Sequence, residues 1–216
     1  QEPTAGAPIF EPVSICVGEP LNLPTTSMNG ITGSWSPAPD NTVTATYTFT
    51  LDSFEKRYNA DLANDFGNLV NRIFILISKN FDDKIPNKYF FDLLDNNFIK
   101  NVEKLRDKAK EDYTNLKIHD GIENSISIIR LINKFLEEKA PWKTIKENKT
   151  KAGTTIYLST EALRIGTVLL YPIIPKKSNL ILESIKCSPK DNIDFGYLKE
   201  ELNINIIKNI FPRIQE

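Results

Sequence analysis

The absence of lysine and arginine from the first 52 residues divides this 216-residue chain into two kinds of sequence. Those 52 residues carry seven of the 13 prolines and nine threonines, whereas the rest carries all 27 basic residues and 23 of the 28 acidic ones. Proline removes a backbone donor and clashes inside a helix, and threonine favours the pleated sheet. We therefore expect a non-helical segment at residues 1–51 and a different fold for the rest of the chain, of which residues 53–216 carry a net charge of +4.

The first segment has the composition of short strands and turns. Residues 43–50 are rich in threonine, valine and aromatic side chains and partly alternate, which predicts a strand. The pairs Asn29-Gly30 and Asp40-Asn41 supply residues that are typical of turns. Because two or three strands alone bury too little surface to be stable in water, residues 1–51 are expected to be either β-rich or disordered.

Beyond residue 52 the apolar residues recur with helical spacing. Residues 53–79 form the first such pattern, and Asp52 or Ser53 can cap its start. Its apolar positions are Leu62, Phe66, Leu69, Val70, Ile73 and Ile77. The same spacing predicts further helices over residues 95–116, 120–139, 153–170 and 176–185.

The pattern over residues 153–170 is apolar on most of its faces, so we expect this helix to lie at the centre of the fold. Pro141 interrupts the preceding pattern and suits the first turn of a new helix. Four or five amphipathic helices joined by short links make a bundle. The predicted architecture is therefore mainly α, with a helical bundle over residues 52–186 and a C-terminal segment, residues 187–216, packed on it.

Composition argues against most kinds of catalytic or metal centre. Cys16 and Cys187 cannot supply a cysteine-based zinc site, and the single histidine, His119, argues against a site of several histidines. No glycine-rich phosphate loop is present, and the longest apolar run falls far short of the roughly 20 residues that a membrane span needs. We therefore expect no catalytic residue, no metal site and no membrane, which leaves a binding surface.

Three residues indicate what that surface binds. Asn68 and Arg72 are four residues apart, so their side chains share one face of a helix beside apolar neighbours. Trp142 follows Pro141 directly after a long helix, where a large ring can be held rigidly and left partly exposed. An aromatic ring stacks an unpaired base and an arginine or asparagine bonds its edge, so the set suits single-stranded nucleic acid. In the alternative arrangement, Trp142 fills the end of the bundle and Arg72 pairs with a carboxylate such as Asp65.

Four blocks of sequence favour the interpretation that this surface binds nucleic acid. They are RYNADLANDFGNLVNR at residues 57–72, Glu138-Lys139-Ala140-Pro141-Trp142-Lys143, Glu161-Ala162-Leu163-Arg164 and Phe211-Pro212-Arg213-Ile214. In this order they resemble the anticodon-binding domain of methionyl-tRNA synthetase. The resemblance covers about residues 51–216, some three quarters of the chain.

The resemblance implies an α-helical module that binds the CAU anticodon of methionine tRNA for protein synthesis in the cytoplasm. The family's anticodon-reading asparagine and arginine fall on Asn68 and Arg72. Its base-stacking tryptophan falls on Trp142, which is preceded by the matching Pro141. By this resemblance Trp142 stacks the first anticodon base while Asn68 and Arg72 bond its edge, and the +4 charge adds attraction for phosphates.

The sequence departs from a complete synthetase of this family. The HIGH and KMSKS-type motifs of the catalytic domain are not present in these residues. ATP and zinc would therefore belong to a catalytic domain that is missing here, and no cofactor is expected in this chain. We expect a fragment that recognises tRNA, works with the catalytic domain of the parent synthetase, and has no ligase activity of its own.

A second resemblance covers about residues 1–50. The run from Ile15-Cys16-Val17-Gly18 through Trp35-Ser36-Pro37 to residues 46–50 is similar to part of the immunoglobulin-like repeats of secreted bacterial surface adhesins. Because adhesins are secreted and synthetases are cytoplasmic, the junction indicates a chimera. The alternative function is therefore a fragment of a secreted surface or adhesion protein with a helical passenger domain, in which Cys16 pairs with Cys187.

Overall fold

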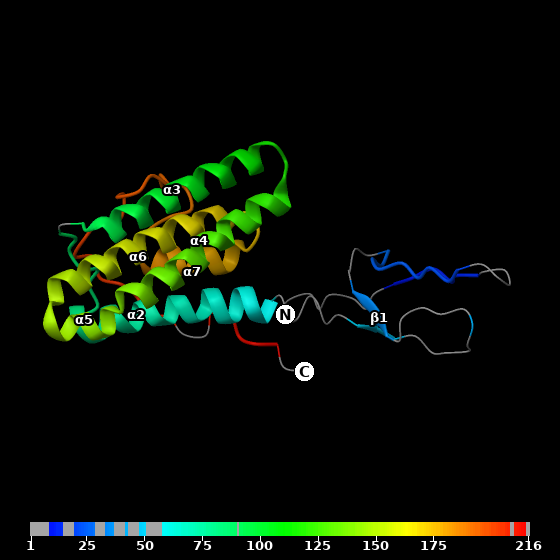
Figure 1. Cartoon of the computed structure of the whole chain (residues 1–216), viewed down its shortest axis with the longest axis horizontal. Coiled ribbons are helices and arrows are strands. Elements are labelled where there is room, and N and C mark those ends of the chain that lie inside the picture. Colours follow the sequence, from blue (N-terminus) through cyan, green and yellow to red (C-terminus); the bar gives the residue numbers. More distant parts are fainter. Residues whose placement is uncertain are drawn as a thin grey trace. The chain divides into compact units, whose positions relative to one another are not determined.

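A computed structural model gives the fold of the chain and describes residues 9–14, 20–28, 33–36, 42, 48–50, 58–89, 91–207 and 210–214. The chain forms two compact units (Figure 1). One comprises Gln1–Ala60 together with Arg213–Glu216, and the other comprises Asp61–Pro212. Each unit is described by itself below.

The smaller unit contains an antiparallel pair of short strands, β1 (Ser34–Ser36) and β2 (Thr48–Thr50). Trp35 stands opposite Phe49 in this pair, and its indole Nε1 donates to the carbonyl of Pro24 at 2.9 Å. Strand β2 is the end of the strand predicted over residues 43–50, of which residues 43–47 lie outside the described part of the chain. Cys16 and both predicted turn pairs also lie outside it.

The first predicted helix is present, and its described part opens with a stretch of π-helix. The stretch η1 (Tyr58–Gly67) leads directly into α2 (Asn68–Phe81). The buried residues of α2 are Leu69, Val70, Ile73, Phe74 and Ile77, which include the apolar positions that the spacing singled out there. Residues 53–57, where the prediction placed the helix start, lie outside the described residues.

Two long helices follow and pack against each other. They are α3 (Leu93–Thr114) and α4 (Ile118–Lys139), and the rings of Phe98 and Phe135 stack between them with centroids 4.0 Å apart. Helix α3 begins two residues before its predicted start because Asp92 caps it, accepting a hydrogen bond from the backbone N–H of Asp95 at 3.0 Å.

The central helix is α6 (Lys149–Leu170), as its all-round apolarity predicted. It packs against α2, α3 and α4 and also against two shorter helices, α5 (Pro141–Glu147) and α7 (Pro175–Ser184). Pro141 is the first residue of α5, where its missing N–H costs no helical hydrogen bond. The five predicted helices are all present, and the prediction of a mainly helical bundle is confirmed (Figure 1).

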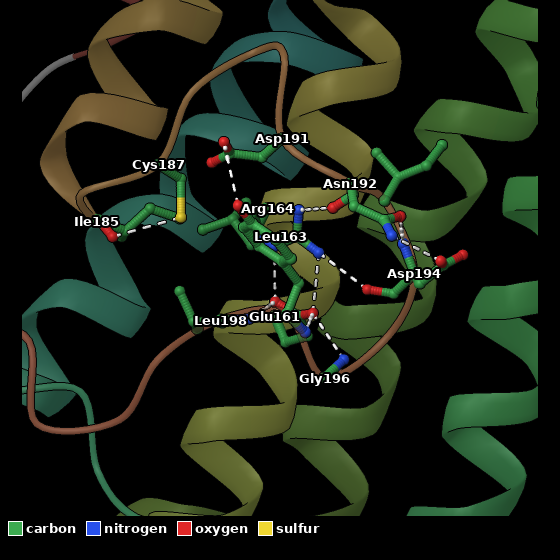
Figure 2. A network of polar contacts seen from close by, with 12 residues as sticks. Glu161, Leu163, Arg164, Ile185, Cys187, Asp191, Asn192, Asp194, Gly196 and Leu198 are labelled. Atoms are coloured by element: carbon green, nitrogen blue, oxygen red, sulfur yellow. Dashed lines mark hydrogen bonds and ion pairs between the residues drawn. The ribbon is translucent and has the colours of Figure 1, made fainter.

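After α7 the chain lies along α6, held by a buried ion pair (Figure 2). The side chains of Glu161 and Arg164 are both fully buried, and Arg164 Nε donates to Glu161 Oε2 at 2.7 Å. Arg164 also donates to the carbonyls of Asn192 and Asp194 at 2.6 and 3.1 Å. The Glu161 carboxylate accepts backbone hydrogen bonds from Gly196, Tyr197 and Leu198. This network satisfies backbone groups of a loop that has no helix or strand to pair with.

The fold contains no candidate for a membrane span among the residues described. None of the helices there combines the length and apolarity that crossing a bilayer requires.

Candidate nucleic-acid interface

Asn68 and Arg72 lie one turn apart at the start of α2, beside its buried face. Leu69, Val70 and Ile73 on the same helix are fully buried. Asn68 is exposed, and the Arg72 side chain retains 36% of its accessible surface. The helix therefore holds an amide and a guanidinium side by side at the protein surface.

The turn between α4 and α5 brings Trp142 to this pair. Ala140 at the turn adopts the left-handed conformation, with φ 41° and ψ 58°, and Pro141 behind it is buried. The Trp142 side chain is half-buried, and the Arg72 guanidinium carbon lies 5.8 Å from the centroid of its ring. That separation is within the range of a cation–π contact. Trp142 thus stands beside Arg72 and keeps part of its indole accessible.

Arg72 has an acidic partner other than the one considered from the sequence. Its Nη1 donates to Glu137 Oε1 at 2.7 Å, and the Glu137 side chain is 62% exposed. Asp65, the partner suggested by spacing, instead has its carboxylate 3.6 Å from Arg130 Nε. Because the Arg72–Glu137 pair is in contact with solvent, it contributes little to stability and can exchange partners.

A polar hollow of about 460 Å³ adjoins the pair. Its walls come from η1, α2 and α4 and consist of Asn64, Asp65, Asn68, Arg72, Arg130 and Asn133. Asn133 Nδ2 donates to the carbonyl of Asp65 at 3.1 Å, which joins α4 to η1. A hollow lined by amide and guanidinium groups can hydrogen-bond a planar polar group such as a nucleobase edge.

Arg130 and Asn133, which line this hollow, were not predicted from the sequence. Arg130 Nη2 donates to Asp61 Oδ1 at 2.7 Å, and Glu123 lies 3.6 Å from its Nη1. Burial opposes the charge of Arg130, but Asp61, Glu123 and Asp65 outweigh it and raise the pKa of this guanidinium. Their spacing could have indicated a shared surface, because Arg130, Asn133 and Glu137 follow one another at intervals of three and four residues and so lie on one face of α4.

Comparison with known proteins places this geometry in a family. Residues 85–214 match the model of the anticodon-binding domain of methionyl-tRNA ligase. The chain belongs to that family. The matched residues include Trp142 and the polar residues of α4, whereas Asn68 and Arg72 precede them.

Individual methionine–tRNA ligases are similar over a longer stretch. The enzyme of Clostridium acetobutylicum is 36% identical over 175 residues, which are 77% of this chain and 27% of that protein. The enzyme of Methanobrevibacter smithii is 31% identical over 170 residues, which are 78% of this chain and 26% of that protein. The chain therefore spans about a quarter of the length of the ligases that it matches.

The fold of this anticodon-binding domain is also that of a solved ligase structure. The apo form of Mycobacterium tuberculosis methionyl-tRNA synthetase superposes with a TM-score of 0.70 at 25% identity. The superposition covers 76% of this chain and 35% of the synthetase. The fold is therefore shared with part of a methionyl-tRNA synthetase, and the family model identifies the matched residues as an anticodon-binding domain.

Proposed function

We propose that this chain is the tRNA-recognition module of a methionine–tRNA ligase and that it binds the CAU anticodon of methionine tRNA. The observation that carries the proposal is the placement of Trp142 beside Arg72, with both side chains partly accessible. Stacking of an unpaired base on an aromatic ring is worth about 1–3 kcal/mol, so one indole can dominate a small RNA contact.

Specificity for the first anticodon base comes from the groups next to the indole. Cytosine presents a carbonyl oxygen and a ring nitrogen as acceptors on its pairing edge. The Arg72 guanidinium and the Asn68 amide supply donors within one helical turn of each other. A base without matching acceptors leaves these donors unpaired, which is how such a site rejects it. Pro141 fixes the direction in which the chain enters the helix that carries Trp142.

Arg72 must leave Glu137 to meet the base, at a small cost because their pair is exposed to solvent. The polar hollow beyond Asn68 provides further donors for a neighbouring nucleotide. The charge of +4 over residues 53–216 favours association with a phosphate backbone whatever its sequence.

The ligase reaction itself is assigned to residues outside this chain. The matched ligases are about four times as long as the region matched, and the family model concerns anticodon binding. We infer that the catalytic domain of the parent synthetase is the partner that binds ATP and carries zinc. The present chain would then be a cytoplasmic fragment that contributes recognition and no catalysis.

The first segment is assigned a separate origin. We infer that residues 1–51 derive from an adhesin-like repeat fused to the bundle at residues 52–186 and its C-terminal segment, residues 187–216, which makes the chain a chimera. The matched ligases favour RNA recognition over a secreted adhesion protein.

A titration with RNA hairpins tests the proposed function. A fluorescently labelled anticodon stem-loop of methionine tRNA is compared with the same hairpin carrying a different first anticodon base. We expect the CAU hairpin to bind at least about tenfold more tightly, since an unpaired buried donor costs about 1–3 kcal/mol. Equal affinity for the two hairpins would refute anticodon recognition.

A further inference from the structure

Lys139, the last residue of α4, has an almost fully buried charge. Its side chain keeps 5% of its accessible surface, and its Nζ lies 2.6 Å from Asp92 Oδ2 and 2.7 Å from Asp95 Oδ1. Asp95 is similarly buried, with 6% of its side chain exposed, whereas the Asp92 side chain is 43% exposed. Lysine is almost never fully buried unless it is paired, so a buried ammonium that two carboxylates hold at the junction of two helices is an uncommon feature.

The two carboxylates are held in place by hydrogen bonds that do not involve Lys139. Asp92 Oδ1 accepts the backbone N–H of Asp95 at 3.0 Å, and Asp95 Oδ2 accepts the backbone N–H of Asp92 at 2.9 Å. This reciprocal cap at the start of α3 uses one oxygen of each side chain. The Lys139 ammonium hydrogen-bonds the other oxygen of Asp92 and forms an ion pair with the other oxygen of Asp95, which accepts no hydrogen bond from the described residues. The ammonium is therefore held by two carboxylates whose own positions are set by the cap, and this fixes where the end of α4 must lie.

Replacing a buried ion pair with apolar residues is often neutral or stabilising, so stability alone is a weak reason for it. Fixing one arrangement of helices is the better-supported use of such a pair. Lys151 on α6 also approaches Asp92, but its Nζ is 3.9 Å from Oδ2 and its side chain is 59% exposed. Among these cations, Lys139 makes the close and buried contacts that can set a position.

The chain from Lys139 to the indole has little freedom. Ala140 is in the left-handed conformation, which side-chain-bearing residues adopt only where their surroundings impose it. Pro141 fixes its own φ and is buried, and Trp142 follows it. The Thr144 hydroxyl donates to the carbonyl of Lys139 at 3.1 Å and so closes the turn from the other side.

We propose that Lys139 is a positioning residue for the base-stacking tryptophan. Bound to Asp92 and Asp95, it fixes the turn between α4 and α5 so that the Trp142 indole stands beside Arg72. Only the predicted change in RNA affinity rests on the proposed function. The placement of the indole is a property of the protein alone and can be measured without RNA.

The experiment uses the full chain with Trp35→Phe, which leaves Trp142 as the only tryptophan. Lys139→Met removes the charge and keeps a long apolar side chain. Asp92→Asn neutralises one acceptor while asparagine still caps α3. The matched control is Lys134→Met, which removes a lysine of the same helix that is 74% exposed. The readouts are the emission maximum and anisotropy of Trp142 without RNA, and affinity for the CAU hairpin.

We expect Lys139→Met and Asp92→Asn to shift the emission and lower the anisotropy of Trp142, and to weaken hairpin binding about tenfold. Lys134→Met should leave the emission unchanged and the affinity within about twofold. If Lys139 served only to stabilise the fold, Lys139→Met would lower the unfolding temperature. The Trp142 fluorescence and the hairpin affinity of the folded variant would then be unchanged.

Unchanged emission and affinity in folded Lys139→Met would overturn the inference. If Lys139→Met does not fold, the test rests on Asp92→Asn. Trp142 fluorescence and hairpin affinity equal to those of the Trp35→Phe parent would then overturn the inference. Failure of the parent to bind the hairpin would refute the proposed function instead. A shifted emission in the two variants would still support the positioning role in that case.

Discussion

Arg72 on α2 and Trp142 on α5 meet with the guanidinium carbon 5.8 Å from the centre of the indole ring. Helix α2 supplies the hydrogen-bond donors, and α5 supplies the aromatic ring. Together they place a flat apolar platform beside hydrogen-bond donors, which is the combination that an unpaired base requires. The consequences of this arrangement and of the fold that supports it can be measured.

Arg72→Ala should weaken binding of the CAU hairpin without unfolding the protein. Hydrogen bonds to charged groups are worth about 1.5–3 kcal/mol, so affinity should fall about 10- to 150-fold. The lost pair with Glu137 is exposed and should cost stability less than about 1 kcal/mol. Fluorescence anisotropy and urea unfolding measure the two effects. Lys134→Ala is the control for loss of a positive charge, and an equal loss of affinity there would point to non-specific attraction.

Ala140→Gly should stabilise the bundle, in contrast to the usual effect of glycine. Ala140 has φ 41°, a conformation that costs alanine about 1–2 kcal/mol and glycine almost nothing. After the extra entropy that glycine loses, a net gain of about 0.5–1 kcal/mol remains. Urea unfolding followed by circular dichroism gives the value. Ala162→Gly in the middle of α6 should lower stability by about 1 kcal/mol or more, and a similar loss at residue 140 would contradict the assigned conformation.

Glu161→Gln should be strongly destabilising. The carboxylate is fully buried and bonded to Arg164, so neutralising it leaves a buried guanidinium without its counter-charge. Breaking such a pair costs about 3–5 kcal/mol. Glu138→Gln, at an exposed pair with Lys134, should change stability by less than about 0.5 kcal/mol. Chemical unfolding compares the two, and equal effects would show that the network in Figure 2 contributes little to the fold.

Cys187 should react slowly with alkylating reagents while the protein is folded. Burial, opposed by Arg164 and assisted by Asp191 and Glu161, raises the pKa of its thiol from 9.0 to about 11. At pH 8 only about one molecule in 1,000 then carries the reactive thiolate. Because the folded pKa is raised, the protonated thiol favours folding, and this contribution is lost as pH rises from about 9 to about 11.

Iodoacetamide labelling followed by peptide mass spectrometry tests the thiol directly. Cys187 should be labelled at pH 8 much more slowly in the native protein than in the same protein in urea. Labelling at equal rates in the two conditions would contradict the raised pKa of Cys187.

Local sequence determines much of this fold and less of its surface. The spacing of Leu69, Val70 and Ile73 predicted the buried side of α2, and the same spacing put Asn68 and Arg72 near the edge of that side. The all-round apolarity of α6 predicted its central place. These predictions succeed because burying apolar surface is favourable for each side chain, so the apolar positions of a helix identify the side that faces the core.

Contacts between distant residues could not be read from spacing. Asp65 lies near Arg72 in sequence, yet Arg72 pairs with Glu137 because the end of α4 packs beside α2. Lys139 resembles the other lysines of a charged helix end, and its burial depends on the cap of α3. Arg130 and Asn133 join the hollow for the same reason. Each depends on how whole helices pack, which a local pattern does not encode.

The most direct test of the account is hairpin binding by Trp142→Ala beside its matched control, Trp35→Ala. Loss of the stacking platform should cost about 1–3 kcal/mol, or about 5- to 150-fold in affinity for the CAU hairpin, with the helical circular dichroism retained. Trp35→Ala should bind as the unmodified chain does. Wild-type affinity in a folded Trp142→Ala variant would contradict the claim that this indole stacks an anticodon base.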